Sequence, residues 1–174
     1  MHKEKLEGAL LALNIAIQTE KDGHEFYLGA AGKTNDPQGK ALFASLAADE
    51  IEHLRLLEGQ REALTKEQRW LPHSELGQEV QVTKAKGAPI FSRGALAQDI
   101  NAYTSDLSAL RIAYLMEKDA VSFYSKAASE TDDPDGKAMY EYLVEMEKEH
   151  QRILEREYNA LAREFWGTMG FEPF

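Results

Sequence analysis

An internal repeat is the sequence feature that most constrains the fold of this chain. Residues 10–58 align without a gap on residues 107–155, at a constant offset of 107 − 10 = 97 positions, and 25 of the 49 aligned positions are identical. Convergence on a generic helical pattern would not produce that identity. The chain therefore contains one supersecondary unit twice, and we expect the two copies to pack around an approximate twofold axis.

Each copy has the pattern of a helical hairpin. Apolar residues recur at spacings of three and four, and the same dipeptide interrupts both copies, Asp36-Pro37 in the first and Asp133-Pro134 in the second. An Asp side chain can cap the free amide groups at a helix start, and Pro is tolerated in the first turn. The pattern predicts four helices, over residues 4–32, 37–64, 104–130 and 134–165.

A long connection separates the two hairpins. It covers residues 65–103, contains several Pro and Gly residues, and is too long for a tight turn. Such a connection favours a four-helix bundle with one crossover over an up-down bundle with short loops only. Within it, residues 79–83 alternate like a short strand, and residues 92–102 could form a helical turn or lead into the third helix.

We therefore expect a single all-α domain over residues 1–174. It would consist of two duplicated hairpins and the connection between them, with Gly167 ending the last helix. The predicted parts are hairpin 1 over 4–64, the crossover over 65–103, hairpin 2 over 104–166, and a tail over 167–174.

Charge and composition exclude several classes of function. The formal net charge of −10 disfavours nucleic acid as a partner, because phosphate binding relies on clustered Lys and Arg. Since the chain contains no cysteine, disulfides, thiolate metal sites and thiol nucleophiles are excluded, and any electrons must come from outside. No apolar run has the length of a membrane span and the N-terminus lacks a signal-peptide pattern, so we expect a cytoplasmic protein without membrane contact.

Two Glu-x-x-His pairs lie within apolar stripes of the predicted helices. In residues 37–64, Glu50 and His53 follow Leu46 and precede Leu57 at spacings of three or four residues. Residues at this spacing share one helix face, so both side chains are expected to face the core. Their counterparts 97 positions along the chain form the second pair, Glu147 and His150.

The other two predicted helices supply one inward carboxylate each. Glu20 lies on the same apolar stripe as Ile17 and Tyr27, and its counterpart in the other copy is Glu117. The sequence thus predicts that six candidate metal ligands meet in the core: Glu20, Glu50, His53, Glu117, Glu147 and His150.

Four carboxylates in a low-dielectric core would repel one another, so they should either take up protons or bind cations. A Glu and a His three residues apart on a helix can engage one ion, and carboxylates can bridge two ions. Nitrogen and oxygen donors suit iron, manganese or zinc, and the general order of affinities does not choose among them. The alternative is a metal-free polar network, for which the cluster offers too few hydrogen-bond donors.

At these six residues the chain resembles the ferritin-like superfamily of di-iron carboxylate proteins, most closely its rubrerythrin-type branch. The resemblance implies a ferritin-like bundle with two iron ions as cofactors, which react with hydrogen peroxide or dioxygen. Rubrerythrins also carry a Glu three residues after the ligand on the third helix, where this chain has Ala120, and a rubredoxin domain, for which it has no cysteine. The remaining six-ligand set is similar to that of bacterioferritin-type centres.

Tyr27 and Tyr124 are candidate catalytic residues close to the cluster. Each follows the Glu of its own helix by seven residues, so its phenol should lie about two turns away and could hydrogen-bond a carboxylate. Aromatic rings at this spacing also fill core space, and the two interpretations stay open.

Other histidines and the tryptophans have weaker patterns. His24 lies four residues after Glu20 and could be an additional base or ligand, or a packing or surface residue; its counterpart is Val121. We interpret the remaining histidines as solvated and the tryptophans as packing or interface residues: His2, His73, Trp70 and Trp166.

Three functions follow from the site and the resemblance. The first is an oxidoreductase that reacts ferrous iron with peroxide or dioxygen and takes electrons from an external donor protein or small reductant. The second is a ferroxidase that oxidises iron for storage in an assembly. The third is a non-enzymatic bundle that holds zinc or manganese structurally. The resemblance also implies a homodimer.

Overall fold

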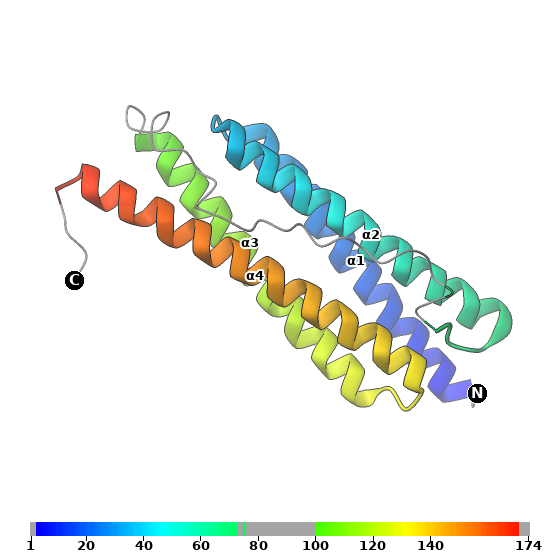
Figure 1. Cartoon of the computed structure of the whole chain (residues 1–174). Helices are drawn as coiled ribbons and strands as arrows, with labels where there is room; N and C mark the ends of the chain where they lie inside the picture. Colours follow the sequence, from blue (N-terminus) through cyan, green and yellow to red (C-terminus); the bar gives the residue numbers. More distant parts are fainter. Residues whose placement is uncertain (1–2, 73–74, 76–99, 171–174) are drawn as a thin grey trace.

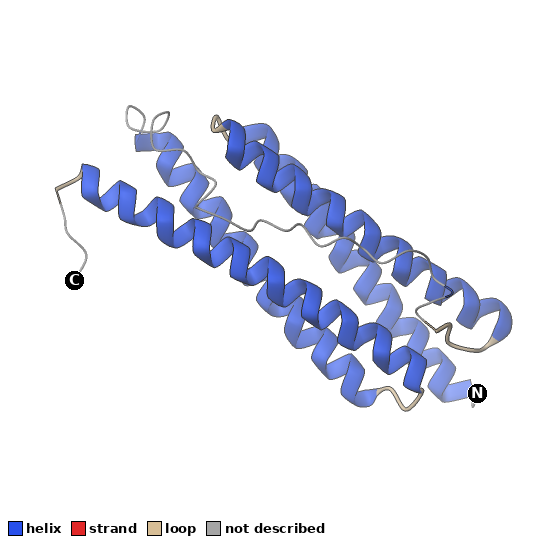
Figure 2. Ribbon diagram, viewed as in Figure 1, coloured by secondary structure: helices blue, strands red, loops and turns tan. Residues whose placement is uncertain are grey.

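The computed structural model describes residues 3–72, 75 and 100–170, with the backbone alone for residues 100–104. This part of the chain contains four long helices and no strand, which confirms the all-α prediction (Figures 1 and 2). The helices are α1 Lys3–Lys33, α2 Pro37–Glu67, α3 Ile100–Glu130 and α4 Pro134–Thr168.

The helices pair as two antiparallel hairpins. Helix α1 packs along α2, α3 packs along α4, and the two hairpins meet where α1 contacts α3. The C-terminal end of α2 and the N-terminal end of α3 lie at opposite ends of the bundle (Figure 1). This arrangement is the crossover topology that the long connection predicts, and it confirms the four-helix bundle.

The starts of α2 and α4 agree with the sequence prediction because the same kind of cap fixes both. The Asp36 carboxylate accepts hydrogen bonds from the backbone N–H groups of Gln38 and Gly39 at 2.9 and 2.7 Å. Its counterpart, Asp133, accepts from Asp135 and Gly136 at 3.0 and 3.3 Å. The caps satisfy amide groups that have no partner within the helix.

Helix ends differ from the prediction by a few residues. Helix α2 continues to Glu67, where Gln68 adopts a left-handed conformation with φ 55° and donates its N–H to the Leu64 carbonyl. Helix α4 continues past Gly167 to Thr168, because a glycine in a helix is a weak destabiliser and not by itself a stop. Helix α3 begins at Ile100, inside the region expected to be connection. The predicted strand at 79–83 and residues 92–99 lie outside the described residues.

Equivalent ring contacts recur in the two hairpins, as expected for a duplicated unit. Tyr27 stacks on Phe43 with ring centres 6.3 Å apart, and Tyr124 stacks on Tyr140 at 6.2 Å. All four side chains are buried in the core.

Trp70, which follows α2, closes one end of the bundle by packing on Gly136 of α4. A Cβ atom at Gly136 would lie 2.6 Å from two ring atoms of Trp70, which is closer than carbon atoms can approach. Trp70 is buried, as a packing residue should be, whereas Trp166 is 47% exposed.

We predict that Gly136→Ala destabilises the metal-free protein by about 1–3 kcal/mol through overpacking against Trp70. Gly29→Ala is the matched control, because nothing lies within 4 Å of a Cβ at that helical position. It should stabilise by up to about 1 kcal/mol through helix propensity. Chemical denaturation followed by circular dichroism measures both, and equal effects would contradict the close contact.

None of the helices in the described ranges is long and apolar enough to cross a membrane.

Candidate metal centre

The structure brings the six predicted ligand residues together in the middle of the bundle. Helices α1 and α3 contribute one carboxylate each, and α2 and α4 contribute one Glu-x-x-His pair each. Each of the six residues is at most 5% exposed, so water does not solvate the four carboxylates. Burial on this scale requires charge compensation inside the core.

Each histidine directs its Nδ1 atom at three carboxylates. His53 Nδ1 lies 3.1 Å from Glu20, 3.3 Å from Glu50 and 3.0 Å from Glu147. His150 Nδ1 lies 3.0 Å from Glu147, 3.7 Å from Glu117 and 3.8 Å from Glu50. The imidazole rings of His53 on α2 and His150 on α4 face each other, with their centres 5.6 Å apart.

The six residues form two overlapping groups, each of the size that one metal ion needs. In each group one ligand atom per residue can be chosen so that all lie within 4.8 Å of one another. Two carboxylates belong to both groups, which is the position that bridging ligands occupy. The groups are Glu20, Glu50, His53 and Glu147, and Glu50, Glu117, Glu147 and His150.

The two tyrosines connect the hairpins at the site. The Tyr27 hydroxyl on α1 donates a hydrogen bond to Glu117 on α3, and the Tyr124 hydroxyl on α3 donates to Glu20 on α1. Each phenol thus bonds to the carboxylate of the other hairpin and also fills core space. Burial, with the charge of the carboxylate that each contacts, raises the pKa of both phenols well above the usual value, so they remain donors at neutral pH.

His24 lies outside the cluster. Its Nδ1 atom is 2.8 Å from the carbonyl oxygen of Ala47, and the side chain is half-buried between α1 and α2. The structure therefore supports a packing role for His24 and places it in neither candidate group. His2 and His73 lie outside the described residues.

Comparison with known proteins agrees with this geometry. The model of the family described as rubrerythrin matches residues 12–158. The chain belongs to the rubrerythrin family. A solved structure of a hypothetical protein from Pyrococcus furiosus superposes with a TM-score of 0.66 at 24% sequence identity, covering 95% of this chain and 93% of that one, and shows the same fold. The search of curated proteins found no match.

The cluster in this rubrerythrin-family chain fits a di-iron site. Its donors are carboxylate oxygens and imidazole nitrogens, which suit iron. The buried Oε1 atom of Glu50, a member of both groups, has no hydrogen-bond partner among the described residues, as expected of an atom reserved for a metal ion. Ala120, three residues after Glu117 on α3, is buried in the core.

Without metal, protons must compensate the buried charge. Burial and the nearby charges of Glu20 and Glu147 raise the pKa of Glu50, and burial with Glu147 raises the pKa of Glu117 to about 7. Burial opposes charge on both histidines, but the surrounding carboxylates prevail and raise their pKa values well above the usual range. The two imidazolium groups in turn overcome burial and hold the pKa of Glu147 well below its usual value.

Asp49 makes the two halves of the site inequivalent. Its carboxylate lies 3.4 Å from His150 Nε2, the ring nitrogen that faces away from the other ligands. The counterpart of Asp49 is Met146, and the corresponding nitrogen, His53 Nε2, has no hydrogen-bond partner among the described residues. Sequence reasoning missed Asp49, although an Asp beside one Glu-x-x-His pair and a Met beside the other was a visible signal.

We predict that Asp49→Asn weakens metal binding at the position that contains His150 by roughly 10–100-fold, because a carboxylate partner orients a ligating imidazole and raises its basicity. The position that contains His53 should change little. Isothermal titration with Mn²⁺ under anaerobic conditions resolves the two affinities. Asp119→Asn, an exposed change on α3, is the control. Equal weakening at both positions would contradict the assignment.

Proposed function

We propose that this chain is a di-iron oxidoreductase that reacts with hydrogen peroxide or dioxygen. The observation that carries the proposal is the pair of buried ligand groups that share Glu50 and Glu147. Iron bound there would supply the one-electron redox changes that none of the chain's carboxylates or imidazoles can undergo.

The chain's own residues would hold and shield such a pair of ions. Glu50 and Glu147 would contact both ions, while Glu20 with His53 and Glu117 with His150 would hold one ion each. Tyr27 and Tyr124 fix the outer carboxylates through their hydrogen bonds and keep the two hairpins in register at the site. The surrounding core excludes bulk water, which strengthens every electrostatic contact within the cluster.

The test loads the protein with ferrous iron under anaerobic conditions and mixes it separately with peroxide and with dioxygen. We expect oxidation faster than that of free ferrous iron with at least one oxidant, followed by charge-transfer absorption. A Glu50→Ala variant should lose this acceleration. Oxidation no faster than free iron with both oxidants would refute the proposal, and two tightly held zinc or manganese ions without iron turnover would favour a structural metal site.

The same iron-loaded protein also tests whether the chain stores iron in an assembled cage. A ferroxidase that stores iron would take up many ions per chain and elute as a large assembly, whereas the proposed oxidoreductase binds two ions per chain. Size-exclusion mass and iron content after aerobic loading decide between them.

A further inference from the structure

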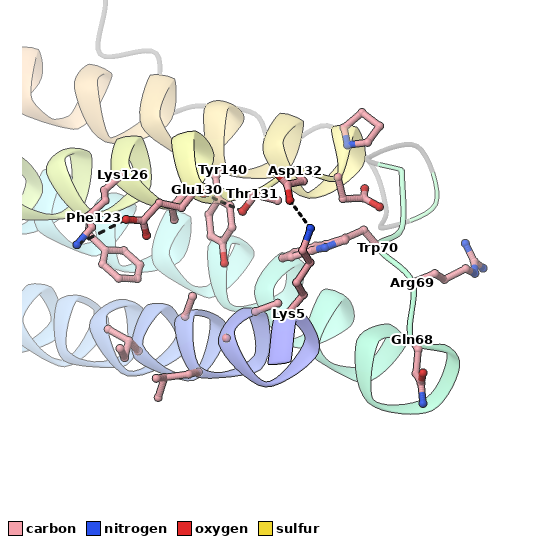
Figure 3. Close-up of a pocket in the computed structure, with 18 residues that line it drawn as sticks. Lys5, Gln68, Arg69, Trp70, Phe123, Lys126, Glu130, Thr131, Asp132 and Tyr140 are labelled. Atoms are coloured by element: carbon pink, nitrogen blue, oxygen red, sulfur yellow. Dashed lines mark hydrogen bonds and ion pairs between the residues drawn. The ribbon is translucent and has the colours of Figure 1, made fainter. Parts of the chain in front are cut away.

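A cavity of ≈ 970 Å³ lies at the end of the bundle where Trp70 packs on Gly136, and Trp70 forms part of its wall (Figure 3). It lies between the first turns of α1, the segment after α2, the end of α3 and the start of α4. Its walls are largely apolar and include Trp70, Phe123 and two partly exposed residues of α1, Leu11 and Ile15. This size and lining are typical of sites for small organic ligands.

One fully buried residue in the wall of this cavity, Tyr140, carries a hydroxyl group. Tyr140 lines it and is 1% exposed, and its hydroxyl end points toward α1 (Figure 3). The hydroxyl oxygen has no hydrogen-bond partner among the described residues. Burial raises the pKa of Tyr140, so the group is a protonated donor at neutral pH. Since a buried donor without an acceptor is costly, a ligand with an acceptor oxygen would satisfy it.

A continuous row of oxidisable rings runs from this cavity to the metal centre. The Trp70 ring meets the Tyr140 ring edge to face at 5.9 Å, and Tyr140 stacks on Tyr124 at 6.2 Å. The Tyr124 hydroxyl then donates to Glu20 of the cluster. Trp and Tyr are the side chains that lose an electron most readily, so the row is a possible path for electrons.

The duplicated half provides an internal comparison. The counterpart of Tyr140 is Phe43, which stacks on Tyr27 at 6.3 Å with an interplanar angle of 27°, close to the 6.2 Å and 25° of the Tyr140 pair. Packing alone therefore does not require a hydroxyl at position 140. The row of Trp and Tyr rings lies in the hairpin next to the cavity. In the other hairpin the equivalent ring is Phe43, and a phenylalanine ring is far harder to oxidise than a tyrosine or tryptophan ring.

We propose that the cavity binds a small aromatic reductant of the hydroquinone class and that Trp70, Tyr140 and Tyr124 pass its electrons to the metal centre. This inference rests on the proposed function and names the electron donor for a chain that contains no cysteine. The flat ring of such a ligand would pack against Trp70 and Phe123. One of its oxygens would accept the hydrogen bond of Tyr140.

The overall exchange balances. A hydroquinone loses two electrons and two protons and becomes a quinone, and hydrogen peroxide gains two of each and becomes two water molecules. The rings carry one electron at a time. When Tyr124 gives up an electron its phenolic proton moves to Glu20 along the existing hydrogen bond, and it returns when Tyr124 is reduced by way of Tyr140. The protons that leave the hydroquinone enter solvent, and the reduction of peroxide to water consumes the same number.

Binding can be tested without metal. Trp166→Phe leaves Trp70 as the only tryptophan, because the chain contains two. Titration of this metal-free variant with 2-methyl-1,4-naphthoquinone should quench Trp70 fluorescence saturably, and adding Ile15→Asp in the cavity wall should weaken binding. Quenching that rises linearly without saturation would refute a bound ligand.

Electron transfer is tested by rapid mixing of the iron-loaded, peroxide-oxidised protein with the reduced naphthoquinone. Tyr140→Phe and Trp70→Phe should slow re-reduction of the centre by about tenfold or more. The rate of the preceding oxidation by peroxide is recorded for each variant, and the rate of re-reduction is compared with it. Tyr158→Phe, the same change on α4 beyond the centre, is the control. Phenylalanine already occupies the counterpart position, where Phe43 stacks on Tyr27, so we expect Tyr140→Phe to fold.

The outcomes separate the two proposals. Normal oxidation with re-reduction as fast in Tyr140→Phe and Trp70→Phe as in Tyr158→Phe would overturn the ring path alone. A wild-type centre that peroxide and dioxygen do not oxidise would overturn the proposed function, and the ring path with it.

Discussion

Glu147→Ala is expected to abolish the binding of both metal ions. Glu147 belongs to both ligand groups, and its two oxygens lie 3.0 Å from His53 Nδ1 and 3.0 Å from His150 Nδ1. Glu20→Ala, by contrast, should weaken mainly the ion of one group, because Glu20 belongs to that group alone. A change from two ions to none is thus specific to the shared carboxylates.

Equilibrium dialysis with Mn²⁺ and elemental analysis measures the stoichiometry. Glu145→Ala, an exposed change two residues earlier on α4, should still bind two ions. Removing Glu147 also takes from both imidazolium groups a carboxylate that each contacts at 3.0 Å, which should destabilise the metal-free protein by about 3–5 kcal/mol. Glu147→Gln preserves the shape of the side chain and guards against a folding defect. Two ions bound by a folded Glu147→Gln protein would contradict the bridging role.

The metal-free protein is expected to lose stability as the pH rises from about 5 to 8. Glu117 has an ordinary pKa of 4.5 and a pKa of about 7 in the folded chain, so the folded state binds more protons than the unfolded state between these values. Stability then falls with rising pH. The histidines act in the same direction: their stabilisation is complete below the unfolded pKa of 6.5 and is lost as the pH rises through their raised folded values. The pKa of Glu147 is lowered, so its contribution to stability is lost only as the pH falls below its ordinary value of 4.5, outside the range from 5 to 8.

The raised pKa of Glu117 changes the free energy of unfolding by on the order of 3 kcal/mol across this pH range. For a chain of this size that corresponds to roughly 6–12 °C in melting temperature. Thermal melts of metal-free protein between pH 5 and 8 measure it. Glu117→Gln should flatten the dependence, and saturating Mn²⁺ should reverse it because metal binding displaces these protons. A melting temperature that is constant or rises with pH in the metal-free wild type would contradict the account.

The fold and the ligand positions could be predicted because they follow from periodicity and repetition. The gapless offset assigns a counterpart to each of Glu20, Glu50 and His53, and the apolar stripe around each places it in the core. The Asp-Pro dipeptides fix two helix starts, because a cap is a local interaction that the sequence displays directly.

What could not be predicted depends on contacts between helices. The hydrogen bond from each tyrosine crosses to the other hairpin, and neither spacing nor period reveals which carboxylate it reaches. The difference between Asp49 and its counterpart Met146 was visible in the sequence, but the contact of Asp49 with His150, 101 positions away on another helix, was not. The end of α2 was placed too early because no local signal marks it, and Gln68 takes a left-handed conformation that its residue type does not suggest.

The central claim is that these six residues hold two metal ions. Crystals of the protein loaded with Mn²⁺ would show the ions directly through their anomalous scattering. The account predicts two peaks in the bundle core, one among Glu20, Glu50, His53 and Glu147 and the other among Glu50, Glu117, Glu147 and His150. An empty core in crystals that hold Mn²⁺ elsewhere, or a single peak bound by the carboxylates without either histidine, would contradict it.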